Sequence, residues 1–70
     1  MDTQSFKVKA KYNTAEYGDK DEQIHVTKKG HIYDAVPQEY YRVVVACEDG
    51  QQRLFSQGYF GKLFEIVKEN

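Results

Sequence analysis

Few side chains in this sequence fall at the spacing that metal binding requires. The candidate ligands His25, His31 and Cys47 form no close-spaced pair, so we expect no metal site. The acidic run Asp19-Lys20-Asp21-Glu22 lacks the ligand spacing and the terminal glutamate of a calcium loop. We therefore interpret this run as part of a solvated acidic loop.

Catalytic residues are equally hard to assemble from this chain. Its two serines are Ser5 and Ser56, and neither has an identifiable histidine and acid partner for nucleophilic catalysis. The sequence also lacks a glycine-rich phosphate loop and a dinucleotide fingerprint. We predict a protein that is not an enzyme and needs no cofactor.

The tyrosines offer a binding surface rather than a reactive site. Tyrosine is favoured as an anchor at protein interfaces. The candidate partner-binding residues are four tyrosines expected on or near one face and two acids of the neighbouring loop: Tyr12, Tyr17, Tyr40, Tyr59, Glu16 and Asp19. We predict a protein–protein interaction module whose partner is another protein or a peptide. The alternative is that these rings only cap the core while their hydroxyls stay in water.

Basic residues support a second hypothesis, that of a small nucleic-acid-binding barrel. Its candidate residues are three lysines on one strand face and two arginines: Lys7, Lys9, Lys11, Arg42 and Arg53. Tyr40 would be available to stack on a base. Alternating lysines also keep the outer face of a strand soluble, however, and ten basic against eleven acidic residues weaken retention on nucleic acid at physiological salt.

The length and composition are those of one small domain. Seventy residues, 40% of them hydrophobic, include six tyrosines and four phenylalanines, which suits a compact fold rich in β-structure. We expect a single domain over residues 1–70 that acts as a monomer or weak dimer. Residues 1–4 and 68–70 are expected to fray.

Cysteine usage and hydrophobicity favour a soluble cytoplasmic protein. The single Cys47 cannot form an intramolecular disulfide, and we expect it to be a small buried residue in a strand. Residues 1–5 have neither the basic nor the apolar region of a secretory leader. The longest apolar run, residues 43–47, is far too short to cross a bilayer, so no membrane partner is expected.

Alternation of apolar and polar residues predicts the first strand. Residues 6–12 alternate without a break, which places Phe6, Val8, Ala10 and Tyr12 on the buried face. Residues 13–23 show no apolar period and predict a long, net acidic loop.

The rest of the chain predicts further short strands separated by turns. Strands are expected over residues 24–27, 31–36, 40–47 and 52–55. Gly30 and the Asp49-Gly50 pair mark turns, and Pro37 is expected to interrupt the sheet. The strand over 40–47 should point Tyr41, Val43 and Val45 inward. Residues 63–67 predict a last strand, with a helix over 61–69 as the competing interpretation.

The order of these features resembles the Src homology 3-like barrels. The residues that carry the resemblance are Ala10 and Tyr12 at the end of the first strand, the Lys28-Lys29-Gly30 turn, and the segment from Gly50 to Phe60. The resemblance implies an all-β fold, a single small five-stranded barrel with a short helical turn near residues 56–60. The chain is also similar to small barrel proteins of Gram-positive bacteria and their phages.

Departures from the family pattern affect its peptide-binding groove. That groove stacks prolines of a polyproline helix between planar aromatic rings. Here Tyr40 stands where the family has a tryptophan, Thr14 replaces a tyrosine and Ser56 replaces a proline. Tyr12, Tyr40 and Tyr59 would form only a partial shelf, so proline-rich peptide binding is a further alternative.

Overall fold

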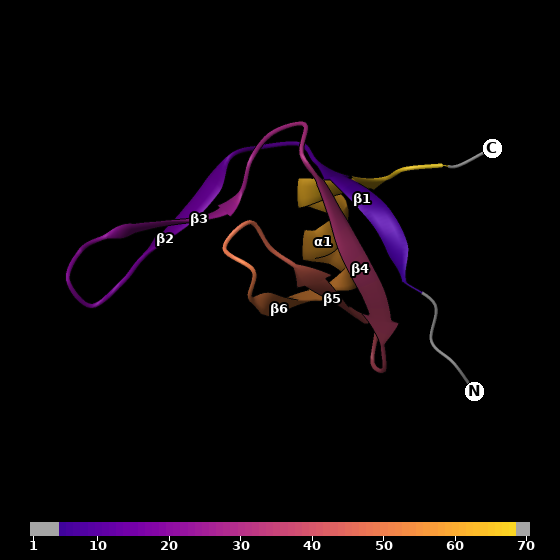
Figure 1. Ribbon diagram of the computed structural model, residues 1–70. Coiled ribbons are helices and arrows are strands. Elements are labelled where there is room, and N and C mark those ends of the chain that lie inside the picture. The colour runs from indigo at the N-terminus through magenta and orange to yellow at the C-terminus, as the bar shows by residue number, and fades with distance from the viewer. Residues whose placement is uncertain (1–4, 69–70) are drawn as a thin grey trace.

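The computed structural model describes residues 5–68, which form seven strands and one short helix (Figure 1). The elements in chain order are β1 Phe6–Ala10, β2 Thr14–Tyr17, β3 Gln23–Thr27, β4 Ile32–Gln38, β5 Arg42–Ala46, β6 Gln52–Ser56, α1 Gln57–Leu63 and β7 Phe64–Ile66. The predicted fraying at residues 1–4 and 69–70 lies outside the described residues.

Five of the strands form one antiparallel sheet in the order β6-β5-β4-β1-β7, and β2 pairs with β3 in a separate hairpin. Figure 1 shows this hairpin projecting from one end of the molecule. The prediction of a small all-β fold is confirmed. Within residues 5–68 neither sheet closes into a barrel, since β6 and β7 end the larger sheet as separate edges.

The core lies between the inner face of the larger sheet and α1. Alternate residues of β1, β4 and β5 point into it, as their period of two predicts. The buried apolar side chains of the described residues are Val8, Ala10, Val26, Tyr33, Ala35, Val43, Val45, Cys47, Phe60 and Phe64. The burial predicted for Cys47 is thus confirmed, although it lies one residue beyond the end of β5.

The predicted loop over residues 13–23 is instead mostly a β-hairpin. Thr14–Tyr17 pairs antiparallel with Gln23–Thr27, and the Gly18 N–H donates to the Glu22 carbonyl at 2.9 Å to close the turn. Most of these side chains are polar, so there was no alternation of apolar and polar residues from which β2 could be predicted. Cross-strand hydrogen bonding, which depends on the backbone alone, forms the hairpin.

Two tyrosines that were predicted to face the core point outward. The strand β1 ends at Ala10, so its alternation no longer decides the direction of Tyr12, which is exposed. Tyr41 lies in the turn between β4 and β5, with a positive φ of 58°, and is 81% exposed. The other residues predicted to point inward from that segment, Val43 and Val45, are buried as expected.

Pro37 does not interrupt the sheet as predicted, because β4 continues through it to Gln38 and pairs Pro37 with Val43. The pairing of β4 with β1 ends at Ala35. Within residues 5–68, β4 beyond Ala35 pairs with β5 alone, and a strand side without a second ladder tolerates a residue that has no N–H group.

The last segment contains both a helix and a strand. α1 begins after Ser56 and is longer than the predicted helical turn, and β7 follows it directly. The last strand is therefore confirmed in a shorter form, whereas the competing helix over residues 61–69 is wrong. β7 pairs with β1, with Ala10 opposite Phe64.

Candidate functional site

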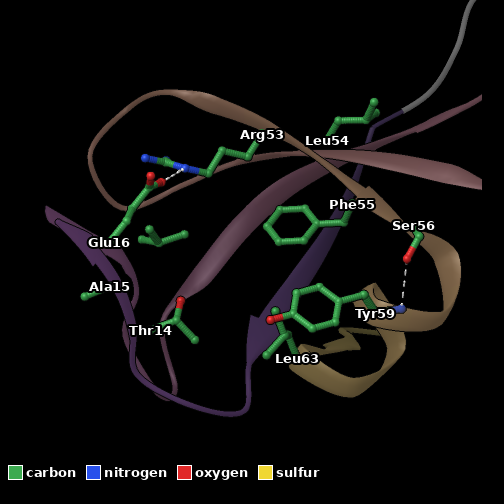
Figure 2. Close-up of a pocket in the computed structure, with 10 residues that line it drawn as sticks. Thr14, Ala15, Glu16, Arg53, Leu54, Phe55, Ser56, Tyr59 and Leu63 are labelled. Atoms are coloured by element: carbon green, nitrogen blue, oxygen red, sulfur yellow. Dashed lines mark hydrogen bonds and ion pairs between the residues drawn. The ribbon is translucent and has the colours of Figure 1, made fainter. Parts of the chain in front are cut away.

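An open groove lies between the projecting hairpin and the segment formed by β6 and α1 (Figure 2). It has a cavity volume of about 540 Å³. Its lining residues come from β2, β3, β6 and α1: Thr14, Ala15, Glu16, Val26, Arg53, Leu54, Phe55, Ser56, Tyr59 and Leu63. The groove therefore exists only because a segment expected to be an irregular loop folds back beside β6.

Two stacked rings form the aromatic wall of the groove. The rings of Phe55 and Tyr59 lie 6.3 Å apart between centroids with an interplanar angle of 18°. Phe55 also packs edge-on against the buried Phe64 at 5.5 Å, which anchors the pair to the core. Tyr59 remains 56% exposed. Such a ring can bury apolar surface when a ligand covers it and offer its hydroxyl for a hydrogen bond.

Ser56 caps the start of α1 and holds the backbone of Tyr59 in its first turn. As the N-cap residue it has an extended backbone, and its Oγ accepts a hydrogen bond from the Tyr59 N–H at 3.3 Å (Figure 2). This satisfies one of the N–H groups that the first turn of a helix leaves without an intrahelical partner. A serine here thus has a local structural role.

Arg53 holds the other end of the groove together. Its guanidinium makes two hydrogen bonds to the Asp49 carboxylate, of 2.8 and 2.9 Å, and a third to Glu16 on β2. The hydrogen bonds from Arg53 lower the pKa of Asp49 to about 2, and the same contacts raise the pKa of Arg53. Charge-assisted bidentate pairing of this kind is geometrically specific. The bidentate pair joins Arg53 to the turn after β5, and the separate hydrogen bond to Glu16 links β6 to β2 across the groove.

The predicted partner-binding residues are distributed over more than one surface. Glu16 and Tyr59 line the groove, whereas Tyr12, Tyr17 and Asp19 do not. Tyr17 ends β2 and Asp19 follows it in the hairpin turn, and both are exposed. The structure thus brings together one tyrosine and one acid of the predicted set.

Tyr40 lies at a different place, in the turn between β4 and β5. It lines a second shallow pocket with Tyr41 and Gln57, and the Arg42 guanidinium carbon lies 5.7 Å from the centre of its ring. Both tyrosines have positive φ angles, of 60° and 58°. This backbone is uncommon outside glycine, asparagine and aspartate.

The lysine face of β1 is matched by carboxylates on both neighbouring strands. Lys7 forms an ion pair with Asp34 of β4, its direct cross-strand partner. The Nζ of Lys9 lies 4.0 Å from a carboxylate oxygen of Glu65, which is opposite it on β7. Neighbouring acids reduce the positive potential that would attract a phosphate backbone.

The other candidate nucleic-acid-binding residues are engaged as well. The Nζ of Lys11 donates to the carbonyl of Gly61 at 3.1 Å. Arg42 packs over the ring of Tyr40, and Arg53 belongs to the two-carboxylate cluster described above. The five candidate cations therefore do not form one continuous basic surface.

Sequence patterns missed several residues of the groove, among them Leu54 and Leu63. Leu54 lies on an edge strand and is exposed. From sequence alone a leucine in a strand is assigned to the core, so its place on the groove is recognised only once the strand order is known. Leu63 ends α1, whose extent was underestimated. The contact between Arg53 and Glu16 joins residues 37 positions apart and left no local signal.

A separate polar cluster connects the turn before β4 with the turn after β5. The Tyr33 hydroxyl donates to a Glu48 carboxylate oxygen at 2.6 Å and accepts from the Lys28 N–H at 2.8 Å, while His31 Nδ1 lies 3.1 Å from the same oxygen. Burial raises the pKa of Tyr33 to about 12, and the hydrogen bond from Tyr33 lowers the pKa of Glu48. This cluster stabilises the two turns.

Neither a metal centre nor a membrane span is found in the part of the chain that the structure describes. No three histidine, cysteine, aspartate or glutamate side chains of residues 5–68 are grouped to hold a metal ion. The one described helix is too short to cross a membrane. Comparisons with protein-family models, curated proteins and solved structures found no match to this chain.

Proposed function

We propose that this protein is a non-enzymatic interaction module that binds a segment of a partner protein in the groove between β2 and the β6–α1 segment. The single observation that carries this proposal is the half-exposed Tyr59 ring, stacked on Phe55 and lining an open cavity. Interface hot spots are enriched in tyrosine that fills a well-packed site.

The charge distribution supports a protein ligand over nucleic acid. The lysines of β1 face carboxylates, and Arg53 is held by Asp49 and Glu16. Sequence-independent binding of nucleic acid draws its affinity from basic residues that neutralise phosphates. Basic residues that already pair with carboxylates would have to exchange them for phosphates, which reduces the free energy gained on binding nucleic acid.

The kinship with Src homology 3-like domains and the bacterial or phage origin belong to this proposal as well. A long acidic segment after β1 and a short helix before β7 follow the order that the resemblance implies. In the groove, Thr14 and Ser56 stand where that family places ring or proline surfaces. We therefore favour a partner segment other than a proline-rich one, in a cytoplasmic setting.

Selection from a random-peptide library displayed on phage, with the immobilised protein as bait, tests the proposal. We expect selected peptides to bind the protein and to lose about 10-fold in affinity with Tyr59→Ala, since truncation of a tyrosine anchor costs roughly 1–2 kcal/mol. Titration calorimetry measures the dissociation constants.

Tyr17→Ala is the matched control, because Tyr17 is 69% exposed but lies outside the groove. It should leave the affinity unchanged. A library that yields no binder, or peptides that bind the Tyr59→Ala variant as tightly as the unchanged protein, would contradict the proposal. Circular dichroism of both variants checks that they fold.

A further inference from the structure

The groove follows the backbone edge of a strand. β6 ends the five-stranded sheet, with β5 as its strand neighbour on one side. Four consecutive residues of the chain here, Arg53 to Ser56, line the groove. Side chains of consecutive strand residues point to opposite faces, so a cavity that touches all four runs along the edge between them.

The hydrogen bonds on either side of β6 indicate which backbone groups point into this edge. The Cys47 N–H donates to the Gln51 carbonyl at 2.9 Å, and the Gln57 N–H donates to the Tyr41 carbonyl at 2.7 Å. Hydrogen-bonded pairs alternate with non-bonded pairs in an antiparallel ladder. Leu54, which lies opposite Val44, falls at the intervening position, so its N–H and carbonyl point away from β5.

The same alternation applies along the rest of the strand. Arg53 and Phe55, opposite Val45 and Val43, direct their backbone groups toward β5. Gln52 and Ser56, like Leu54, direct theirs outward. An outward edge of this kind is a template for an added strand.

The charges around the groove favour a basic ligand. The hairpin turn carries three carboxylates and one lysine, namely Asp19, Asp21, Glu22 and Lys20, whereas Glu16 and Asp49 at the groove already pair with Arg53. A segment with lysine or arginine that leaves the groove past Glu16 would approach this acidic hairpin. Complementary charges of this kind speed association and fix the orientation of the partner.

We infer that the groove binds an extended, basic segment of a partner protein as an additional β-strand on the edge of β6, with an apolar side chain of that segment against Tyr59. This inference rests on the proposed function and specifies its binding mode. Main-chain hydrogen bonds to the edge give affinity in strand addition, while pockets for alternate side chains give specificity.

Amide hydrogen exchange followed by NMR tests the binding mode, with a peptide selected from the random library as the probe. Binding should slow exchange of the Leu54 amide at least 10-fold. The Phe55 amide is the internal control, because its N–H faces β5 in the free protein and should already be protected. Methylation of single backbone nitrogens of the peptide should abolish binding at alternate positions, because only every second N–H would face β6.

The alternatives give different results. A peptide that loses affinity with Tyr59→Ala but leaves the Leu54 amide unprotected would overturn strand addition and leave the proposed function standing. Protection of Leu54 without an effect of Tyr59→Ala would contradict the proposed function instead. If the Leu54 amide becomes protected as protein concentration rises without peptide, and sedimentation equilibrium shows a dimer, the occupant is a second copy and the inference is wrong.

The charge requirement is tested with the same peptide. The variant Asp19→Asn/Asp21→Asn should weaken binding about 3-fold at low salt, because rim charges act mainly on association. Asp34→Asn/Glu65→Gln is the control, since it removes two carboxylates that lie outside the groove. Selected peptides without lysine or arginine, or affinities that the acidic variant does not change, would show that the ligand is not basic.

Discussion

At the scale of single residues, Arg53 bridges the two sides of the groove. It is the only described residue that joins the β2 strand, through Glu16, to the turn after β5, through Asp49. Nothing in its sequence neighbourhood separates it from the other basic residues. Tyr59, by contrast, is exposed beside the buried Phe60, its neighbour in α1.

Acid should weaken the fold through Asp49. Its pKa is lowered from an ordinary value of 3.8 to about 2 by Arg53, so the folded state favours the charged form. The resulting stabilisation is fully present above about pH 4 and is lost as the pH falls toward 2. Urea unfolding at a series of pH values should show this loss of stability, and Asp49→Asn should remove the part that comes from Asp49.

Asp19→Asn is the control for this experiment, since it removes the same charge from the hairpin turn, away from Arg53. If Asp49→Asn and Asp19→Asn reduce the pH dependence of the free energy of unfolding equally, the Asp49–Arg53 pair does not cause that dependence.

At the scale of elements, the turn between β4 and β5 has an unusual sequence for its backbone. Tyr40 and Tyr41 both have positive φ, in a turn whose flanking residues Gln38 and Arg42 are paired. Asparagine and glycine are favoured there, and a bulky residue in this region costs of order 1–3 kcal/mol. The two exposed rings thus lie on a backbone conformation that costs stability.

Replacing the pair with Asn-Gly should therefore stabilise the protein. We expect Tyr40→Asn/Tyr41→Gly to raise the free energy of unfolding in urea by about 1 kcal/mol. Tyr40→Ala/Tyr41→Ala keeps two side chains at positive φ and is the matched control, with a smaller or negative change. Destabilisation by the Asn-Gly variant would mean that the rings contribute more through contacts, such as that of Tyr40 with Arg42, than the backbone conformation costs.

At the scale of the whole molecule, stability depends on a small core closed by β7 and α1. Phe64 is buried and its ring contacts those of Tyr33, Phe55 and Phe60. It therefore joins the sheet, the helix and the aromatic wall of the groove. A domain of this size has a total stability of only about 4–10 kcal/mol.

Truncation at this position should remove a large part of the free energy of unfolding. Phe64→Ala is expected to cost about 3–5 kcal/mol, a large part of the total. Ile66→Ala, in the same strand but 58% exposed, should change stability by less than about 1 kcal/mol. Thermal denaturation followed by circular dichroism compares the two. Similar melting temperatures for both variants would show that the core does not depend on Phe64.

Local pattern alone determined the all-β class, the inward residues of β1 and β5, and the hairpin at Asp49-Gly50. Each of these follows from alternation or turn preference within a few residues. Tertiary structure decided that residues 14–27 form a hairpin, that acids face the lysines of β1, and that β6 borders a groove. Those features depend on strand pairing and ion pairs between residues far apart in the chain, for which a local pattern carries no information.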